Sequence, residues 1–398
     1  MLPISRAFFV FSLFGLSIIL CFLYKGPWST KESKITLEHR STKLSLENNT
    51  KVILFWNDYY GEKTFGMGNG YEGFQQCPES NCYATSDHST LMDPNIIVKA
   101  VAFHVPRLKL DDVKWLKSKK QEILQLNQGI DPTFIMFSME PPEGSKVNGN
   151  VEDPMFRDFF DMTMSYKHDS DIYSPYGLFV DKTTGLPPMD WKAHLDGLTA
   201  ERRVSLKERT KDIAWGVSHC ESASKREEYA QKLIDLHQLQ VDIFGKCGNH
   251  NFPKRQLVDE GYKLLAQNYK FYLSFENSNC KDYITEKLFF AMQYGLLPIA
   301  LGGFSIEDYE KSIPPHSYLH VDHFENPEQL MDYLVKLSGD EELYSSYFWW
   351  KEYYDIKVFK DLSPAACKLC QLLNIENYKS PNDYDNVQQY WHQCKTQE

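Results

Sequence analysis

The sequence lacks an excess of positive charge. Its 43 lysines and arginines are outnumbered by 54 aspartates and glutamates, which gives a formal net charge of −11. Proteins that bind nucleic acids need basic side chains to neutralise the phosphates, so this balance argues against a nucleic-acid partner. A smaller anionic ligand, such as a nucleotide, would need a local basic pocket in an otherwise acidic protein.

The chain also lacks internal repeats and low-complexity tracts, and its 398 residues are long for one domain but suit two. Hydrophobic residues make up 42% of the chain, which is enough for sizeable cores. Apolar runs indicate strands at residues 51–56, 96–104, 133–139, 162–167, 213–218, 241–245, 269–275 and 298–301. Helices are expected at residues 110–126 and 224–238. We therefore expect an α/β fold with an N-terminal domain (51–199), a charged helical connector (200–211), a second domain (212–365) and a C-terminal segment (366–398).

An uncharged apolar run, residues 7–24, lies between Arg6 and Lys25 and is just long enough to span a thin bilayer. A cleaved signal peptide is the alternative, but the run is longer than a usual signal core and no small-x-small cleavage site follows it. We expect an uncleaved signal anchor with residues 1–6 in the cytosol. Residues 25–50 would then form a lumenal stem that ends in the glycosylation sequon Asn48-Asn49-Thr50.

Cysteine usage agrees with a lumenal protein. Of nine cysteines, Cys21 lies in the membrane run, and the even number that remains fits disulfides. The eight are Cys77, Cys82, Cys220, Cys247, Cys280, Cys367, Cys370 and Cys394. The alternative is a zinc site made of Cys77, Cys82, Cys367 and Cys370, whose spacings permit it. The lumenal location argues against that site.

The most informative segment, residues 270–303, predicts one βαβ unit. It reads as a strand (270–275), a polar loop (276–282), a helix (283–294) and a second strand that ends in Gly302-Gly303. The loop lies at the carboxyl end of the first strand, where parallel sheets bind ligands. Tyr283, Glu286 and Lys287 would share one helix face in the first turns, where a lysine suits a phosphate.

Within this segment, FENS followed by DYITEKL resembles the donor-binding motif of the α1,3-fucosyltransferase family, glycosyltransferase family 10. The resemblance extends over residues 51–373 and is strongest at 213–321. It implies a GT-B-like architecture, in which two Rossmann-like domains face a cleft. It also implies a Golgi type II membrane enzyme that transfers L-fucose from GDP-β-L-fucose to an N-acetylglucosamine hydroxyl, with inversion. The acceptor stays open: the N-glycan core, a lactosamine antenna or a protein hydroxyl.

The general base is expected at Glu140. It follows the apolar run TFIMFSM and precedes Pro141-Pro142, so it lies where a buried strand meets a loop. Partial desolvation there would raise the pKa of its carboxyl toward that of a useful base. The resemblance implies that Glu140 deprotonates the acceptor hydroxyl.

The donor site is expected around two strand–loop–helix junctions. The resemblance implies that Arg226 contacts the donor pyrophosphate and that Lys287 shares in neutralising it. Ser218 is expected to contact the nucleotide, although this chain has His219 where relatives commonly have asparagine. The remaining residues would position fucose and nucleotide; they are Asn277, Tyr283 and Glu286. The resemblance also implies that Cys77 and Cys82 pair with Cys367 and Cys370, with Cys220–Cys247 as a third disulfide.

Two other functions stay open on the sequence. Asp169-Ser170-Asp171 could hold a metal-bound nucleotide sugar, as DxD tripeptides do in other glycosyltransferases. The resemblance places this tripeptide in a different segment, without an obligate metal. We expect no obligatory cofactor, with stimulation by Mn²⁺ or Mg²⁺ left open. The other alternative is a lumenal glycan-binding protein without catalysis, which the intact Glu140, Glu286 and Lys287 argue against.

Overall fold

The computed structural model describes residues 46, 49–142, 153–188, 190–191, 204–252, 258–359, 363–382 and 390–395. The expected cytosolic tail, the expected anchor at residues 7–24 and nearly all of the expected stem, including Asn48, lie outside these residues. Among the described residues, no helix combines the length and the apolar character that a membrane crossing requires.

The first half of the chain forms a six-stranded parallel sheet. Its order is β2 (Cys82–Thr85), β1 (Lys51–Phe55), β3 (Val98–His104), β4 (Thr133–Ser138), β5 (Met162–Ser165) and β6 (Ile172–Tyr173). The central strands are buried almost throughout, which is why they appear as continuous apolar runs in the sequence. Helix α1 (Leu110–Leu126) has the bounds that its pattern predicts. The strand order reverses between β1 and β3, so the sheet has a topological switch point there.

The second half forms a five-stranded parallel sheet with the same kind of order. The strands run β9 (Val241–Phe244), β8 (Lys211–Gly216), β10 (Tyr269–Phe275), β11 (Leu297–Leu301) and β12 (Leu319–His320). Its helices are α2 (Arg226–Asp235), α3 (Val258–Asn268), α4 (Glu286–Tyr294), α5 (Ile306–Ser312), α6 (Pro327–Gly339) and α7 (Glu341–Ser346). The switch point of this sheet lies between β8 and β10.

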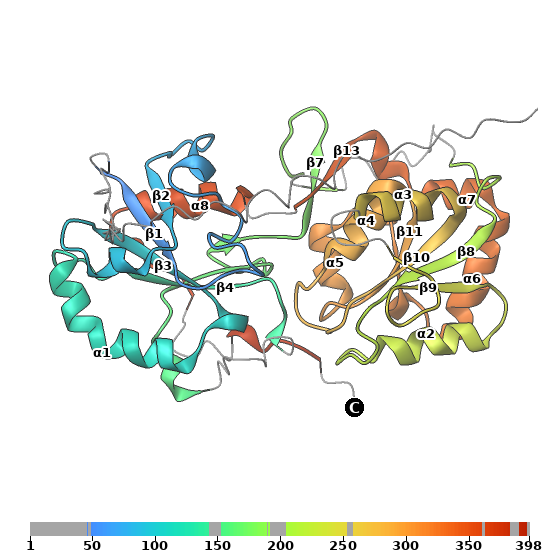
Figure 1. Cartoon of the computed structure of the whole chain (residues 1–398). Helices are drawn as coiled ribbons and strands as arrows, with labels where there is room; N and C mark the ends of the chain where they lie inside the picture. Colours follow the sequence, from blue (N-terminus) through green and yellow to red (C-terminus); the bar gives the residue numbers. More distant parts are fainter. Residues whose placement is uncertain are drawn as a thin grey trace, which may run out of the picture. The chain divides into compact units, whose positions relative to one another are not determined.

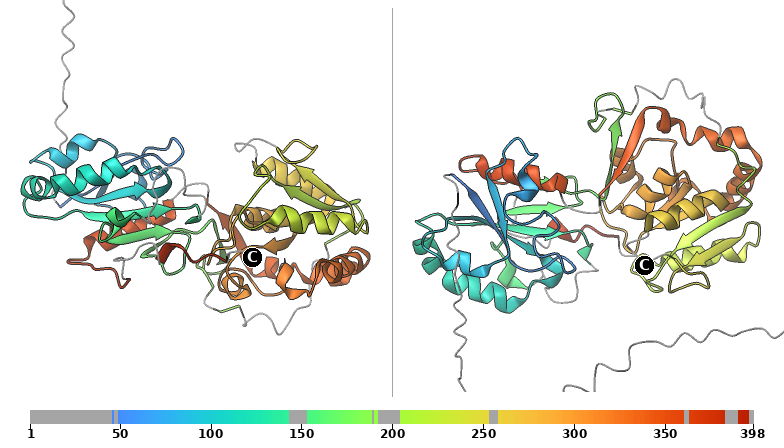
Figure 2. Two further views of the ribbon diagram at one scale, coloured as in Figure 1. Left: turned by 90° about the horizontal axis from the view of Figure 1, so that it is seen from below. Right: turned by 45° about the horizontal axis from the view of Figure 1, so that its top comes forward.

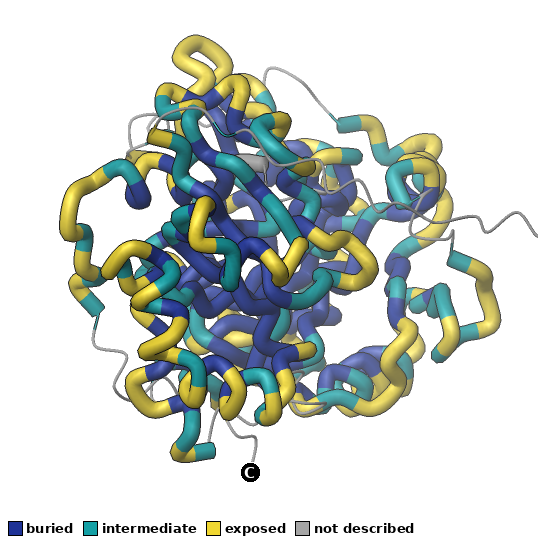
Figure 3. The backbone as a smooth tube through the Cα atoms, turned by 60° about the vertical axis from the view of Figure 1, so that its left-hand side comes forward, coloured by how far each residue is buried: buried dark blue, intermediate teal, exposed yellow. Residues whose placement is uncertain are grey.

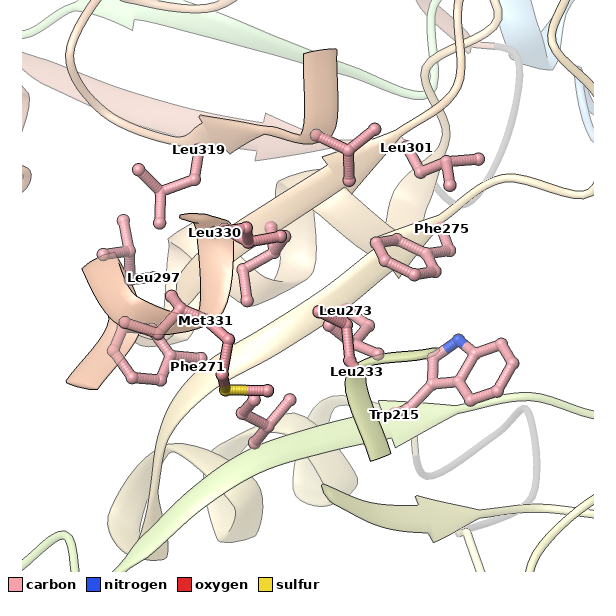
Figure 4. Packing of buried hydrophobic residues seen from close by; sticks show 14 of the residues in the cluster. Trp215, Leu233, Phe271, Leu273, Phe275, Leu297, Leu301, Leu319, Leu330 and Met331 are labelled. Carbon is pink, nitrogen blue, oxygen red and sulfur yellow. The ribbon is translucent and has the colours of Figure 1, made fainter. Parts of the chain in front are cut away.

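The second sheet is held by a continuous apolar core. Phe271, Leu273 and Phe275 of β10 alternate toward the same face, and Leu330 and Met331 of α6 pack in the same cluster (Figure 4). The tube in Figure 3 shows the same organisation for the whole described chain, with buried segments inside and exposed residues in loops and on outer helix faces. The loops that follow the strands are therefore fixed by buried elements on either side.

The expected helical connector is wrong where it can be checked. Residues 200–203 lie outside the described residues, and residues 204–210 form no helix. Strand β8 instead begins at Lys211, two residues before the expected start at 213, and Lys211 pairs with Tyr269 of β10. Arg209 holds this entry by donating hydrogen bonds from Nη1 to the carbonyl oxygen of Gly295 (2.7 Å) and the hydroxyl of Tyr344 (2.9 Å).

Three further boundaries differ from the sequence expectation. Strand β8 ends at Gly216 rather than at residue 218. Helix α2 begins at Arg226 rather than at 224 and ends at Asp235 rather than at 238. The cause at both ends is a left-handed backbone, since Lys225 has φ 48° and His237 has φ 54°.

The end of the chain returns to the first sheet. Helix α8 (Ser363–Asn374), red in Figures 1 and 2, lies beside the blue strand β1 and the short helix η1 (Glu72–Phe74). The disulfides Cys77–Cys367 and Cys82–Cys370 fix it there, so the expected pairing is confirmed. All four cysteines of the zinc alternative are therefore engaged in disulfides.

Two more disulfides and a small ribbon complete the framework. Cys220–Cys247 is present as expected, and Cys280–Cys394 was not foreseen as a specific pair. A two-stranded antiparallel ribbon joins β7 (Gly177–Asp181) to β13 (Tyr354–Val358), two segments far apart in the sequence.

Candidate functional site

A cavity of about 570 Å³ opens at the carboxyl ends of both parallel sheets. Residues that follow β1 and β4 of the first sheet line one part of it, namely Tyr59, Tyr60, Met139 and Glu140. Residues that follow β8 and β10 of the second sheet line another, namely Val217, Ser218, His219 and Asn277. Both switch points thus contribute, which is where open α/β sheets bind ligands.

All seven site residues expected from the sequence line this one cavity. They are Glu140, Ser218, Arg226, Asn277, Tyr283, Glu286 and Lys287. They come from three strand ends, two helix starts and one loop, so their convergence is a result of the fold. The geometry brings them together without by itself assigning a role to any of them.

Lys287 is held in the first turn of α4 by a buried carboxylate. Its Nζ lies 2.8 Å from Oε2 of Glu276 and 2.7 Å from the hydroxyl oxygen of Thr285, and Glu286 lies at 3.5 Å. Burial alone would lower the pKa of Lys287, but the charges of Glu276 and Glu286 outweigh it and raise this pKa. The lysine is therefore charged and fixed in direction at the edge of the cavity.

The expected helix that begins at Tyr283 is wrong. Helix α4 begins at Glu286, because Asp282 has a left-handed backbone (φ 60°) and Thr285 is extended at the helix cap. Asp282 is anchored outside any helix, since its amide donates to Oδ2 of Asp308 (3.1 Å) and its own Oδ2 accepts from the amide of His168 (3.1 Å). Tyr283 still lines the cavity, but as a buried loop residue and not on a shared helix face.

Arg226 connects the two strand ends of the second switch point. The residue is 3% exposed. Its Nη1 donates to the carbonyl oxygen of Phe275 at the end of β10 (2.7 Å), and its Nη2 donates to that of His219 in the loop after β8 (3.2 Å). Its Nε has no hydrogen-bond partner among the described residues. The guanidinium thus supplies fixed positive charge beneath the cavity as well as structural support.

Glu140 lies on the part of the cavity that belongs to the first sheet. Burial raises the pKa of its carboxyl, and a hydrogen bond from the Tyr60 hydroxyl (3.1 Å to Oε1) and the charge of Lys287 act in the opposite direction. The net effect is a raised pKa, as its position at a strand end suggested. A carboxylate with this surrounding is suited to accept a proton.

Sequence reasoning missed Glu276, the buried partner of Lys287. Its side chain is 0% exposed and also accepts hydrogen bonds from the amide and hydroxyl of Thr285, each at 2.8 Å to Oε1. Gly302 makes room for it, because an added Cβ there would lie 2.8 Å from Cγ of Glu276. The signal was present: like Glu140, Glu276 directly follows a buried strand.

The acidic tripeptide that suggested a metal is used for other contacts. Asp169 Oδ2 lies 2.8 Å from Nζ of Lys281, and Asp171 accepts hydrogen bonds from the amide of Thr163 (2.8 Å) and the hydroxyl of Tyr378 (3.0 Å). Neither aspartate lines the cavity. In the described part of the chain, no three His, Cys, Asp or Glu side chains are grouped so that they could hold a metal ion.

Comparisons with known proteins identify the family of the chain. Residues 48–177 match the family described as "Fucosyltransferase, N-terminal", and residues 206–391 match "Glycosyltransferase family 10 (fucosyltransferase) C-term". The chain is 30% identical to Alpha-(1,3)-fucosyltransferase C of Drosophila melanogaster, covering 97% of this chain and 88% of the relative. It is 37% identical to Glycoprotein 3-alpha-L-fucosyltransferase A of the same organism, covering 92% of this chain and 66% of the relative.

Among solved structures, a crystal structure of an alpha1,3-fucosyltransferase covers 85% of this chain and 95% of its own, with a TM-score of 0.50 and 18% identity. At this identity the likeness concerns the fold alone. The two family matches together extend over most of the chain, and the first relative aligns along nearly all of it. The chain therefore belongs to glycosyltransferase family 10, the α1,3-fucosyltransferase family, and is a glycosyltransferase.

Proposed function

We propose that this enzyme transfers L-fucose from GDP-β-L-fucose to the 3-hydroxyl of an N-acetylglucosamine residue, with inversion at the anomeric carbon. One observation carries the proposal. A carboxylate with a raised pKa, Glu140 of the first sheet, and two cations of the second sheet, the buried Arg226 and the partly exposed Lys287, line the same cavity. A direct displacement needs this division between a base for the acceptor and positive charge for the leaving group.

In the proposed reaction, Glu140 accepts the proton of the acceptor hydroxyl as its oxygen bonds to the anomeric carbon of fucose. The bond from that carbon to the GDP oxygen breaks, and GDP leaves with the electron pair. Lys287 and Arg226 stabilise the negative charge that grows on the pyrophosphate. Ser218 contacts the nucleotide, and Asn277, Tyr283 and Glu286 position fucose and nucleotide. These roles rest on the shared cavity and on the family.

We propose that the chemistry has no obligatory metal and that Mn²⁺ or Mg²⁺ at most stimulates it. The fixed cations would do the electrostatic work that a divalent ion does in other glycosyltransferases. We also propose a single-pass type II location in the Golgi membrane with the catalytic part in the lumen. The apolar run at residues 7–24 supports this location, and the four disulfides fit an oxidising compartment.

The names of the relatives support the 3-linkage of this proposal. Both Drosophila relatives are described as 3-fucosyltransferases, whereas a human relative, 36% identical over 61% of this chain, is described as a 3-galactosyl-N-acetylglucosaminide 4-alpha-L-fucosyltransferase. The first two align over far more of the chain, so the 3-linkage is the better supported.

The test is transfer from GDP-fucose to three acceptors: an N-glycan core, a lactosamine antenna and a peptide with serine and threonine. Each reaction is run in excess chelator and, separately, with Mn²⁺, and the linkage of the product is determined by NMR. Glu140→Gln should lower kcat by about 10²–10⁴-fold while GDP affinity stays the same. Glu122→Gln, on the exposed face of α1, is the matched control. Absence of fucose transfer to every acceptor, or full activity of Glu140→Gln, would contradict the proposal.

A further inference from the structure

The loop after β1 holds a tyrosine in a conformation that tyrosine rarely adopts. Tyr59 and Glu62 exchange two backbone hydrogen bonds, each 3.0 Å, and close a two-residue turn. Both central residues have positive φ, 49° at Tyr60 and 99° at Gly61. This is the geometry of a type I′ turn, whose first central position favours Asn, Asp or Gly. A bulky side chain there is strained, so its presence calls for an explanation outside the turn.

The turn directs the Tyr60 side chain to Glu140. The phenol hydroxyl donates to Oε1 of Glu140 at 3.1 Å, across 80 positions of sequence. Tyr60 lines the cavity, and 48% of the residue is exposed, so no packing in a core explains its size. Asparagine would fit the backbone better, but its shorter side chain could not reproduce the reach of the phenol.

Neighbouring groups brace the turn on its outer side. Oδ1 of Asp58 accepts the amide hydrogen of Gly61 (2.7 Å), and the same carboxylate pairs with Arg107 at 3.1 Å. The Arg107 guanidinium lies 5.6 Å from the centre of the Tyr60 ring, within range of a cation–π contact. The strained tyrosine is thus held from both sides, as residues in costly conformations must be.

We propose that Tyr60 is a positioning residue for Glu140, which points the carboxylate at the acceptor hydroxyl and stabilises its charged form. The inference rests on the proposed function, in which Glu140 is the base. A hydrogen bond donated to a carboxylate favours its charged state. Tyr60 therefore keeps a larger fraction of Glu140 ionised at a pH where burial alone would protonate it.

The charges around Glu140 fit this role. Burial raises the pKa of Glu140, and the hydrogen bond from Tyr60 is the strongest effect that lowers it. Across the cavity, Lys287 lowers this pKa further, while Glu286 and Glu276 raise it. The pKa of Tyr60 itself is raised by burial and by the Glu140 charge, so the phenol stays a donor throughout the working pH range.

The test compares Tyr60→Phe and Tyr60→Asn with the full-length enzyme in detergent, using GDP-fucose and the best acceptor. Tyr60→Phe keeps the ring and should lower kcat/KM about tenfold near neutral pH, with the acid limb of the pH profile moved up by about one unit. The loss should therefore grow as the pH falls. GDP affinity should not change. Tyr60→Asn should show the same loss although its thermal midpoint equals or exceeds that of the wild type, because asparagine suits the turn.

Tyr378→Phe is the matched control, since it removes a phenol that donates to a carboxylate, Asp171, which does not line the cavity. Its pH profile should match the wild type. An unshifted acid limb in Tyr60→Phe, or a loss of equal size at every pH, overturns the inference about Tyr60. If Glu140→Gln is inactive in the same assay, a negative result for Tyr60 leaves the proposed function standing. If Glu140→Gln is fully active, the proposed role of Glu140 as the base is wrong.

Discussion

The ion pair between Lys287 and Glu276 gives the sharpest test of how the second sheet prepares the proposed donor site. The two charged groups are 2.8 Å apart, Glu276 is 0% exposed, and the Lys287 side chain is 19% exposed. At an effective dielectric constant of about 20, Coulomb's law gives an attraction of about 6 kcal/mol at this distance. Desolvation of both groups cancels much of it, so the pair as a whole contributes far less. Removing only one partner costs more stability, because the other charge then stays buried without its counter-charge.

We therefore expect Lys287→Met to lower the free energy of unfolding by about 3–5 kcal/mol. Glu276 would keep only neutral hydrogen-bond partners, such as Thr285. Glu276→Gln should cost less, because Lys287 is partly exposed and retains Glu286 at 3.5 Å. The double variant should be destabilised by less than the sum of the two single changes, since both remove the same interaction.

Urea unfolding of the four proteins, followed by tryptophan fluorescence, measures the cycle. Calorimetric titration with GDP tests the other half of the reasoning. Loss of a charged hydrogen bond to phosphate, worth about 1.5–3 kcal/mol, should weaken GDP binding by about 10-fold or more in Lys287→Met. Lys336→Met, on the exposed face of α6, is the control. Additive single changes would refute the coupling, and unchanged GDP affinity would remove Lys287 from the donor site.

Two other predictions concern the framework around this site. Gly302→Ala should lower the free energy of unfolding by about 1–3 kcal/mol and reduce activity, because Gly302 has φ 154° and the new Cβ would lie 2.8 Å from Cγ of Glu276. Gly339→Ala is the control, because its new Cβ would meet nothing within 4 Å. Equal urea midpoints of the two variants would contradict the argument. Replacing both Cys82 and Cys370 by serine should cost about 2–5 kcal/mol in unfolding experiments, whereas an unchanged midpoint would show that the bridge does not anchor α8.

Much of both sheets could be predicted because parallel strands are buried on both faces. Runs such as residues 98–104 and 269–275 are mostly apolar, and both form strands that are buried nearly throughout. The ribbon of β7 and β13 could not be predicted in the same way. Both strands are short, β13 is half exposed, and more than 170 residues separate them, so neither pattern nor turn chemistry indicates the partner.

The seven predicted residues do line one cavity, but their contacts could not be predicted from the sequence. Glu140 and Arg226 were found at strand and helix ends, where the fold itself concentrates ligands. The contacts of Lys287 depend on Glu276, whose burial follows from the Gly302 backbone across the sheet. The start of α4 depends on the left-handed Asp282, which two distant partners hold. Such long-range hydrogen bonds leave no periodic trace in the sequence.

The Asp169-Ser170-Asp171 tripeptide lies in a segment that holds the loop between β10 and α4 in place. Asp169 forms an ion pair with Lys281, and the amide of the neighbouring His168 donates a hydrogen bond to Asp282. The segment after β5 therefore holds the loop between β10 and α4 at two points. The Cys280–Cys394 disulfide ties the same loop to the end of the chain. Asn277 and Tyr283 lie in this loop and Lys287 directly follows it, so these contacts fix the backbone that carries three residues of the cavity.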